Sequence, residues 1–209
     1  GLEATCVVVV TEKTAMMKAD EVLALMKAFA PVSGSRHDDM GYPSVMMFTD
    51  ANGMDVVQKS NGYNWSGTSL ELQDRNNAYY APLIMWQTLY GEITAANNVI
   101  KEIDTSSADA SEQFALAQML ALRAFAYWNL AQLYQFNYAG NENKPCVPLI
   151  TEVNADDAIA NGCPRATVAE VYTQIMNDLN NAIGILGSAK KLGLSRPDKA
   201  HVDLSVAYG

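Results

Sequence analysis

The feature that most constrains the fold is a pair of long segments in which apolar residues recur at helical spacing. The first segment begins near Pro82 and carries one stripe at intervals of three and four residues: Leu83, Trp86, Tyr90, Ile93, Asn97 and Ile100. The second covers residues 110–136 and carries a broader stripe: Leu116, Met119, Leu120, Arg123, Ala126, Leu130, Leu133 and Tyr134. This period is typical of amphipathic helices. Because the short sequence DTSSAD joins the two segments, we expect an antiparallel helix hairpin.

Helical periodicity also occurs before this hairpin. Residues 12–29 predict a helix that is ended by Pro31 and Gly34, and a shorter helical piece is expected over residues 70–80. Residues 31–68 are rich in Gly, Asn, Asp, Ser and Tyr. We call them the polar segment and expect a long irregular excursion there.

A second helix pair is predicted after the hairpin. Its first helix opens with Thr167 and Glu170 in the spacing of a capping box, and its second starts near Pro197 and runs to the last residue. The loop before this pair contains CVPLITE, where Pro148 would confine any strand to a sheet edge. The predicted fold is therefore mostly α, with tetratricopeptide-like helix pairs in a superhelical array and long loop excursions.

The composition excludes several classes of protein. A formal net charge of -9 disfavours binding to nucleic acid or to an anionic membrane surface. The cysteines (Cys6, Cys146 and Cys163) and the two histidines follow no zinc-ligand pattern, and at most one disulfide is possible, with Cys146 and Cys163 the closest pair. No run of 18 apolar residues predicts a membrane-spanning helix.

Acidic residues in the polar segment raise the question of catalysis. Asp38 and Asp39, with Asp50 and Asp55 nearby, are candidates for an acid and a base, but consecutive acids in a loop are more often solvated. His37 has no second metal ligand at helical spacing. The common nucleophile, dinucleotide and phosphate-binding motifs do not occur. We therefore predict no enzyme activity, no cofactor and no metal site.

Aromatic residues give a more specific hypothesis. Tyr42, Tyr63 and Trp65 lie in the polar segment, where a ring offers a flat apolar platform to a sugar and polar neighbours bind its hydroxyls. The predicted ligand-binding residues are Arg36, Asp39, Tyr63 and Trp65. Aromatic residues inside the predicted helices should pack in the core instead: Trp86, Tyr127, Trp128 and Tyr134. Asn97 and Arg123 should hydrogen-bond across the hairpin, since burying them unpaired costs about 2 kcal/mol or more.

Four segments, taken in order, carry a family resemblance. They are WQTLYGEITAANNVIKEID, LAQMLALRAFAYWNLAQLYQFNY, CVPLITE and PRATVAEVYTQIMNDLNNAIGIL. The first contains Tyr-x-x-Ile-x-x-Ala-Asn, and the second contains Leu-Arg-Ala-x-x-Tyr and closes on Leu-x-x-Leu-Tyr. The fourth contains Val-Tyr-x-x-Ile-x-x-Asp-Leu-x-x-Ala. Over residues 86–186, the chain resembles the SusD/RagB family of outer-membrane nutrient-binding lipoproteins.

The resemblance implies a surface-exposed protein, lipid-anchored to the outer membrane. Such a protein would bind a nutrient, with glycan as the expected class, and deliver it to a TonB-dependent, SusC-like transporter. Members of that family are commonly more than twice this length. We therefore expect residues 1–209 to be the N-terminal portion of a SusD-like helical domain that continues beyond residue 209. Cys6 follows Thr5 rather than Gly or Ala, so the lipid anchor is not assigned to Cys6.

Two functions of other classes remain open. One is a helical-repeat scaffold that binds only protein and has no small-molecule ligand. The other is a glycan-active enzyme built from residues that no motif marks. Glycan binding separates the scaffold from the nutrient-binding protein, and new reducing ends in a polysaccharide would indicate the enzyme.

Overall fold

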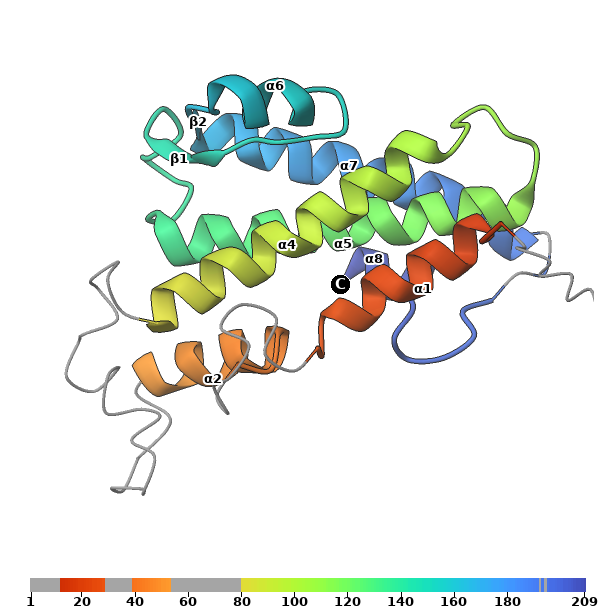
Figure 1. Cartoon of the computed structure of the whole chain (residues 1–209), viewed down its shortest axis with the longest axis horizontal. Helices are drawn as coiled ribbons and strands as arrows, with labels where there is room; N and C mark the ends of the chain where they lie inside the picture. The colour runs from red at the N-terminus through yellow and green to blue at the C-terminus, as the bar shows by residue number, and fades with distance from the viewer. Residues whose placement is uncertain (1–11, 29–38, 54–79, 192, 194) are drawn as a thin grey trace, which may run out of the picture.

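The computed structural model describes residues 12–28, 39–53, 80–191, 193 and 195–209. Within these ranges the chain is mostly helical, which confirms the predicted fold class (Figure 1). The elements in chain order are α1 (Ala15–Leu25), α2 (Tyr42–Asn52), α4 (Tyr80–Glu102), α5 (Ala110–Tyr134), β1 (Pro145–Pro148), α6 (Ala155–Asn161), β2 (Arg165–Thr167), α7 (Val168–Lys191) and α8 (Leu204–Tyr208).

Helices α4 and α5 form the predicted antiparallel hairpin and run side by side (Figure 1). The hydroxyl of Tyr134, at the end of α5, donates to the carbonyl of Pro82, near the start of α4, over 2.9 Å. Nearer the middle of both helices, the Arg123 guanidinium donates to the side-chain oxygen of Asn97 over 2.7 Å. The predicted hydrogen bond across the hairpin is therefore confirmed.

Helix α5 is the central helix of the described structure. It packs against α1, α4 and α7, and sixteen of its 25 residues are buried. A helix that carries apolar residues on all sides is stable only when it is enclosed. Alanines on several of its faces allow the neighbouring helices to approach closely: Ala115, Ala117, Ala124 and Ala126. The predicted stripe is thus part of a wider buried surface.

A two-stranded antiparallel ribbon follows α5. Pro145 of β1 lies opposite Thr167 of β2, and Pro148 lies opposite Arg165. Both strands are sheet edges, as Pro148 predicts, because proline has no amide hydrogen to donate to a further strand. The Arg165 guanidinium donates to the carbonyls of Cys146 and Pro145 over 2.6 and 2.7 Å. The ribbon fixes the point at which the chain enters α7.

The predicted capping box is present where α7 begins. The backbone N–H of Thr167 donates to the Glu170 carboxylate over 2.7 Å, and the N–H of Glu170 donates to the Thr167 hydroxyl over 3.2 Å. The bonds from Thr167 hold the pKa of Glu170 below its ordinary value. This reciprocal pair satisfies two amides that the first turn leaves free.

Helix α2 differs from the prediction for the polar segment. The prediction of an irregular conformation throughout that segment is wrong for residues 42–52, which form this helix. The helix buries one face, made of Ser44, Val45, Phe48 and Ala51. Proline in its first turn favours a helix start because its fixed φ is already helical. The element is only 11 residues long, and the polar residues around it obscured its period.

Replacing Gly41 with alanine should lower the free energy of unfolding by about 1–3 kcal/mol. Gly41 precedes α2 with φ 70° and ψ -140°, a conformation that is essentially confined to glycine. A Cβ at this position would lie 2.8 Å from the carbonyl oxygen of Met26, which already accepts the Tyr42 N–H over 2.8 Å. Urea denaturation of the two proteins measures the change.

Gly91→Ala is the matched control for this substitution. Gly91 lies on the exposed side of α4, and a Cβ there would have no atom within 4 Å. Alanine is the better helix former, so this change should raise the free energy of unfolding by about 0.5–1 kcal/mol. Equal effects of the two substitutions would show that the close approach of α1 and α2 does not require glycine.

The last helix is also shorter than predicted. It begins at Leu204, not near Pro197, because the Asp203 side chain accepts the N–H of Val206 over 2.9 Å and caps the helix there. Upstream, the Asp198 carboxylate accepts the N–H of Ala200 over 2.8 Å. This local bond favours a turn over a helix.

Candidate functional site

The structure describes one of the four predicted ligand-binding residues. Asp39 is buried, at 0% exposed, two positions before Gly41 at the entry to α2. Arg36, Tyr63 and Trp65 lie outside the described residues. All four assignments therefore stay predictions.

The described framework that adjoins these residues in sequence is α2 packed on α4. Val45 and Phe48 of α2 form one buried cluster with Ala81, Ile84 and Met85 of α4. Both parts of the chain that contain predicted ligand-binding residues adjoin α2, one before it and one after it. The packing of α2 on α4 is therefore the described part of the structure that lies next to them in the sequence.

Arg123 of α5 is the centre of a buried ionic network. Its Nε and Nη2 donate to the two carboxylate oxygens of Asp178 on α7, each over 2.7 Å. Its Nη1 donates to Asn97 of α4 and to the carboxylate of Glu152 in the loop after β1. Burial acts to lower the pKa of Arg123, but its hydrogen bonds and the charges of Asp178 and Glu152 raise it above the ordinary value. One charged side chain thus joins three helices and a loop.

Hydroxyl groups of the hairpin hold the CVPLITE segment in place. Tyr90 donates to the carbonyl of Pro148 over 2.6 Å. Tyr127 donates to the carbonyl of Ile150 and accepts its N–H, both over 2.7 Å, and Asn97 donates to the same carbonyl over 3.1 Å. Burial raises the pKa of both tyrosines, so the hydroxyls keep the protons that these bonds need. The residues of the family motifs therefore build the scaffold.

Glu92 of α4 is a buried acid that no sequence motif marks. It is 1% exposed, and neither of its carboxylate oxygens has a hydrogen-bond partner within the described ranges. The hydroxyl of Thr88, one turn earlier, is also buried and lacks a partner there too. Removal from water raises the pKa of Glu92 to about 8. An acid in an amphipathic helix is ordinarily assigned to the exposed face, so no pattern pointed to this residue.

Trp128 corrects the prediction that all the helix aromatics pack inside. Its side chain is 44% exposed on α5, with its ring centre 6.4 Å from that of Phe125. Phe125 meets the ring of Tyr42 at 4.9 Å, and the Tyr42 hydroxyl donates to the Asn129 side chain over 3.2 Å. The other three helix aromatics pack as predicted: Trp86, Tyr127 and Tyr134.

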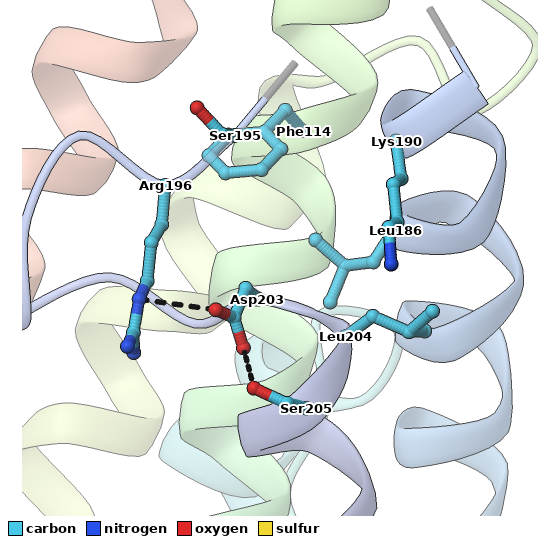
Figure 2. Close-up of a pocket in the computed structure, with 8 residues that line it drawn as sticks. All are labelled: Phe114, Leu186, Lys190, Ser195, Arg196, Asp203, Leu204 and Ser205. Atoms are coloured by element: carbon cyan, nitrogen blue, oxygen red, sulfur yellow. Dashed lines mark hydrogen bonds and ion pairs between the residues drawn. The ribbon is translucent and has the colours of Figure 1, made fainter. Parts of the chain in front are cut away.

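Described residues line several cavities, of which three are considered in turn. One, of about 190 Å³, lies where α5, α7 and the segment leading into α8 meet (Figure 2). Figure 2 shows Arg196 paired with Asp203, at 3.1 Å, and the Ser205 hydroxyl donating to the same carboxylate, at 2.6 Å, beside an apolar wall that includes Phe114 and Leu186. Its volume is below the roughly 300–1,000 Å³ of typical small-molecule sites, and these polar groups already bind one another.

A second cavity, of about 400 Å³, lies beside the turn between α4 and α5. A third, of about 450 Å³, lies beside α6 and β2. None of the three cavities is lined by a predicted ligand-binding residue.

The described residues give no sign of a metal site. They contain no group of three or more His, Cys, Asp or Glu side chains placed to hold an ion. Cys146 and Cys163 are both free, so the bridge that the sequence allowed is not formed. No helix in the ranges that the structure describes is both long and apolar enough to cross a bilayer.

The hairpin of α4 and α5, the docked CVPLITE segment and the capped helix α7 define a helical scaffold whose motif residues serve packing and hydrogen bonding. A family model described as SusD-like, starch-binding and associating with the outer membrane matches residues 16–204. The chain belongs to this SusD-like family. No curated protein matches the chain.

Several solved structures are similar to the chain. A SusD-like carbohydrate-binding protein from Bacteroides vulgatus is 27% identical, with a TM-score of 0.77 over 93% of this chain and 39% of that one. A laminarin-binding SusD-like protein is 26% identical, with a TM-score of 0.62 over 92% of this chain and 37% of that one. A SusD superfamily protein from Bacteroides fragilis, 22% identical, shares the fold, with a TM-score of 0.65 over 92% and 43% of the two chains. The chain thus spans about two-fifths of the length of these structures.

Proposed function

We propose that the protein is a nutrient-binding protein of the cell surface that captures glycan and delivers it to a TonB-dependent, SusC-like transporter. The observation that carries the proposal is the match of residues 16–204 to a family described as starch-binding and associating with the outer membrane. Two solved relatives above 25% identity, described as carbohydrate-binding and laminarin-binding, support glycan as the ligand class.

The proposed ligand contacts come from Arg36, Tyr63 and Trp65, and the buried Asp39 is proposed to support these contacts from inside the protein. An aromatic ring offers a flat apolar face to the CH-rich face of a sugar, and charged side chains hydrogen-bond its hydroxyls. The scaffold supports this assignment indirectly, because the conspicuous motif residues Arg123 and Tyr127 are both engaged inside it. Recognition is therefore assigned to the parts of the chain that adjoin α2.

The protein is proposed to bind its ligand without cleaving it. Glu92 has a pKa near the range of a general acid, but it is 1% exposed and closed off from a polysaccharide. Incubation with laminarin or starch should therefore leave the number of reducing ends unchanged. An increase in reducing ends that is proportional to protein concentration would overturn this part of the proposal.

The proposed location is the outer membrane, with a lipid anchor and the protein facing outside the cell. The family description, which includes association with the outer membrane, supports the location. The proposed partner is a transporter barrel. Affinity purification of the whole protein from detergent-solubilised outer membranes should recover a TonB-dependent barrel in stoichiometric amount, and recovery without any barrel would contradict the delivery role.

Calorimetric screening of the whole protein against oligosaccharides tests the binding function. Laminarin and starch fragments are the first probes, because one solved relative is described as laminarin-binding and the family is described as starch-binding. Saturable binding of either class supports the proposal. A folded protein that binds no oligosaccharide but retains a protein partner would instead be a helical-repeat scaffold.

A further inference from the structure

A histidine held between two carboxylates joins the end of the described chain to its first helix. His201 lies between α7 and α8, and its side chain is 9% exposed. Its Nδ1 lies 2.8 Å from the carboxylate of Asp198, and its Nε2 lies 2.8 Å from the carboxylate of Asp20 on α1. Because Asp20 and His201 are 181 positions apart, this contact closes α1 onto the segment that leads into α8.

The two-sided contact of His201 defines its protonation state. A neutral imidazole has one N–H and one lone pair, so it donates to only one of two carboxylates and turns its lone pair toward the other. The imidazolium ion donates on both sides. Burial acts to lower the pKa of His201, but the hydrogen bonds and charges of Asp198 and Asp20 raise it above the ordinary value. The bond to His201 likewise lowers the pKa of Asp198.

A second attachment beside His201 is independent of pH. Gln118 of α5 donates to the carbonyl of Val202 over 2.8 Å and accepts the N–H of the same residue over 2.6 Å. Gln118 is uncharged and fully buried. Three nearby ion pairs are directed away from His201: Lys18 with Glu102, Lys13 with Glu21, and Arg196 with Asp203. Asp20 from α1 and Asp198 from its own segment are the charged groups in contact with the His201 ring.

We propose that His201 is a pH-sensitive clasp that closes the segment leading into α8 onto α1 when the imidazole is protonated and loosens this contact when the proton leaves. In the closed state, each ring nitrogen donates one N–H to a carboxylate. Loss of one proton turns a lone pair toward a carboxylate, and the segment keeps its attachment to Gln118 while its link to α1 weakens.

The stability of the clasp depends on pH because folding and proton binding by His201 are coupled. The folded pKa of His201 lies above its unfolded value, which is about 6.5 for histidine. The clasp therefore contributes fully to stability below about pH 6.5, and its contribution is lost as pH rises through the folded pKa. The local structure should open more often at alkaline pH.

Hydrogen–deuterium exchange of the whole chain at pH 6 and pH 9 tests the clasp. The protection factor of each amide is calculated relative to unstructured peptide at the same pH. For residues 201–208, this factor should be about three- to tenfold lower at pH 9 than at pH 6. The His201→Gln variant should show no such change between the two pH values. Protection that does not fall with pH in the wild type, or that falls equally in His201→Gln, would overturn the proposal.

A second variant keeps the histidine and removes one carboxylate. In a His37→Asn background, His201 is the single histidine of the chain, so its ring protons are assigned without ambiguity in NMR spectra. Asp20→Asn should shift its titration toward lower pH, because one of the two charges that favour the imidazolium is lost. A titration midpoint at the ordinary histidine value before this substitution, or one that does not move after it, would contradict the clasp.

Discussion

Replacing Arg123 with methionine should lower the free energy of unfolding by about 3–5 kcal/mol. Methionine keeps much of the side-chain volume but leaves the carboxylate of Asp178 buried, at 3% exposed, without its bidentate partner. It also removes the donor to Asn97. An unpaired buried charge is far more costly than a buried pair, which is the reason for the size of the effect. Denaturation in urea at pH 7 gives the measurement.

The double variant Arg123→Met, Asp178→Leu separates the loss of a partner from the loss of packing. Apolar residues of similar volume often replace a buried ion pair with little loss of stability, so the second substitution should recover a large part of the cost of the first. Lys101→Met is the control. It removes an ion pair with Asp156 whose side chains are 56% and 85% exposed, and it should change stability by less than about 1 kcal/mol. Strictly additive costs of the two core substitutions would contradict the network described here.

Replacing Glu92 with glutamine should stabilise the protein at alkaline pH, by on the order of 3 kcal/mol at pH 8. The folded pKa of Glu92, about 8, lies above its ordinary value of 4.5. The contribution of Glu92 to stability is therefore fullest below about pH 4.5, where Glu92 is protonated in both states, and it declines as pH rises from there through the folded pKa. Glutamine has a similar shape but takes up no proton on folding. The variant therefore lacks the loss of stability at rising pH that Glu92 causes in the wild type.

Denaturation at pH 5, 7 and 9 measures the effect of Glu92→Gln. The control is Glu102→Gln on the same helix, where the side chain is 56% exposed and pairs with Lys18 at the surface. This control should change stability by less than about 1 kcal/mol at each pH. Parallel pH profiles for the wild type and Glu92→Gln would show that Glu92 is not the protonated buried acid described here.

The long helices were predictable because each buries a face over many turns. The stripes that contain Tyr90, Ile93 and Leu130 have enough repeats to separate a helix from other structures. The polar residues Asn97 and Arg123 were also informative, because a polar group on an apolar stripe requires a partner in the neighbouring helix. The bond between them follows from that requirement.

The remaining features depend on contacts that no local pattern contains. Helix α2 has too few turns for its period to stand out among polar residues, and α8 begins where Asp203 caps it. Trp128 lies on the part of α5 that its neighbours leave uncovered, which depends on the placement of those helices. The pairing of His201 with Asp20 joins residues 181 positions apart, which periodicity cannot predict.

For the candidate ligand site, the sequence predicts which residue types could bind a sugar but not how they are arranged. Tyr63 and Trp65 drew attention because aromatic residues in a polar segment have no helical stripe to join. Which sugar they would meet, and in which orientation, depends on tertiary placement and is not contained in the spacing of residues. The sequence was more specific about the family, because motif residues such as Arg123 and Tyr127 are fixed by the packing of the scaffold.

Calorimetric titration of laminarin and starch oligosaccharides into the whole protein and its Trp65→Ala variant tests the proposed binding surface most directly. We expect saturable binding by the wild type and at least about a tenfold weaker affinity for the variant, equivalent to about 1.4 kcal/mol. Trp128→Ala, which removes an exposed ring from the scaffold helix α5, should keep the wild-type affinity. Wild-type affinity in Trp65→Ala, or loss of binding in Trp128→Ala alone, would contradict the account.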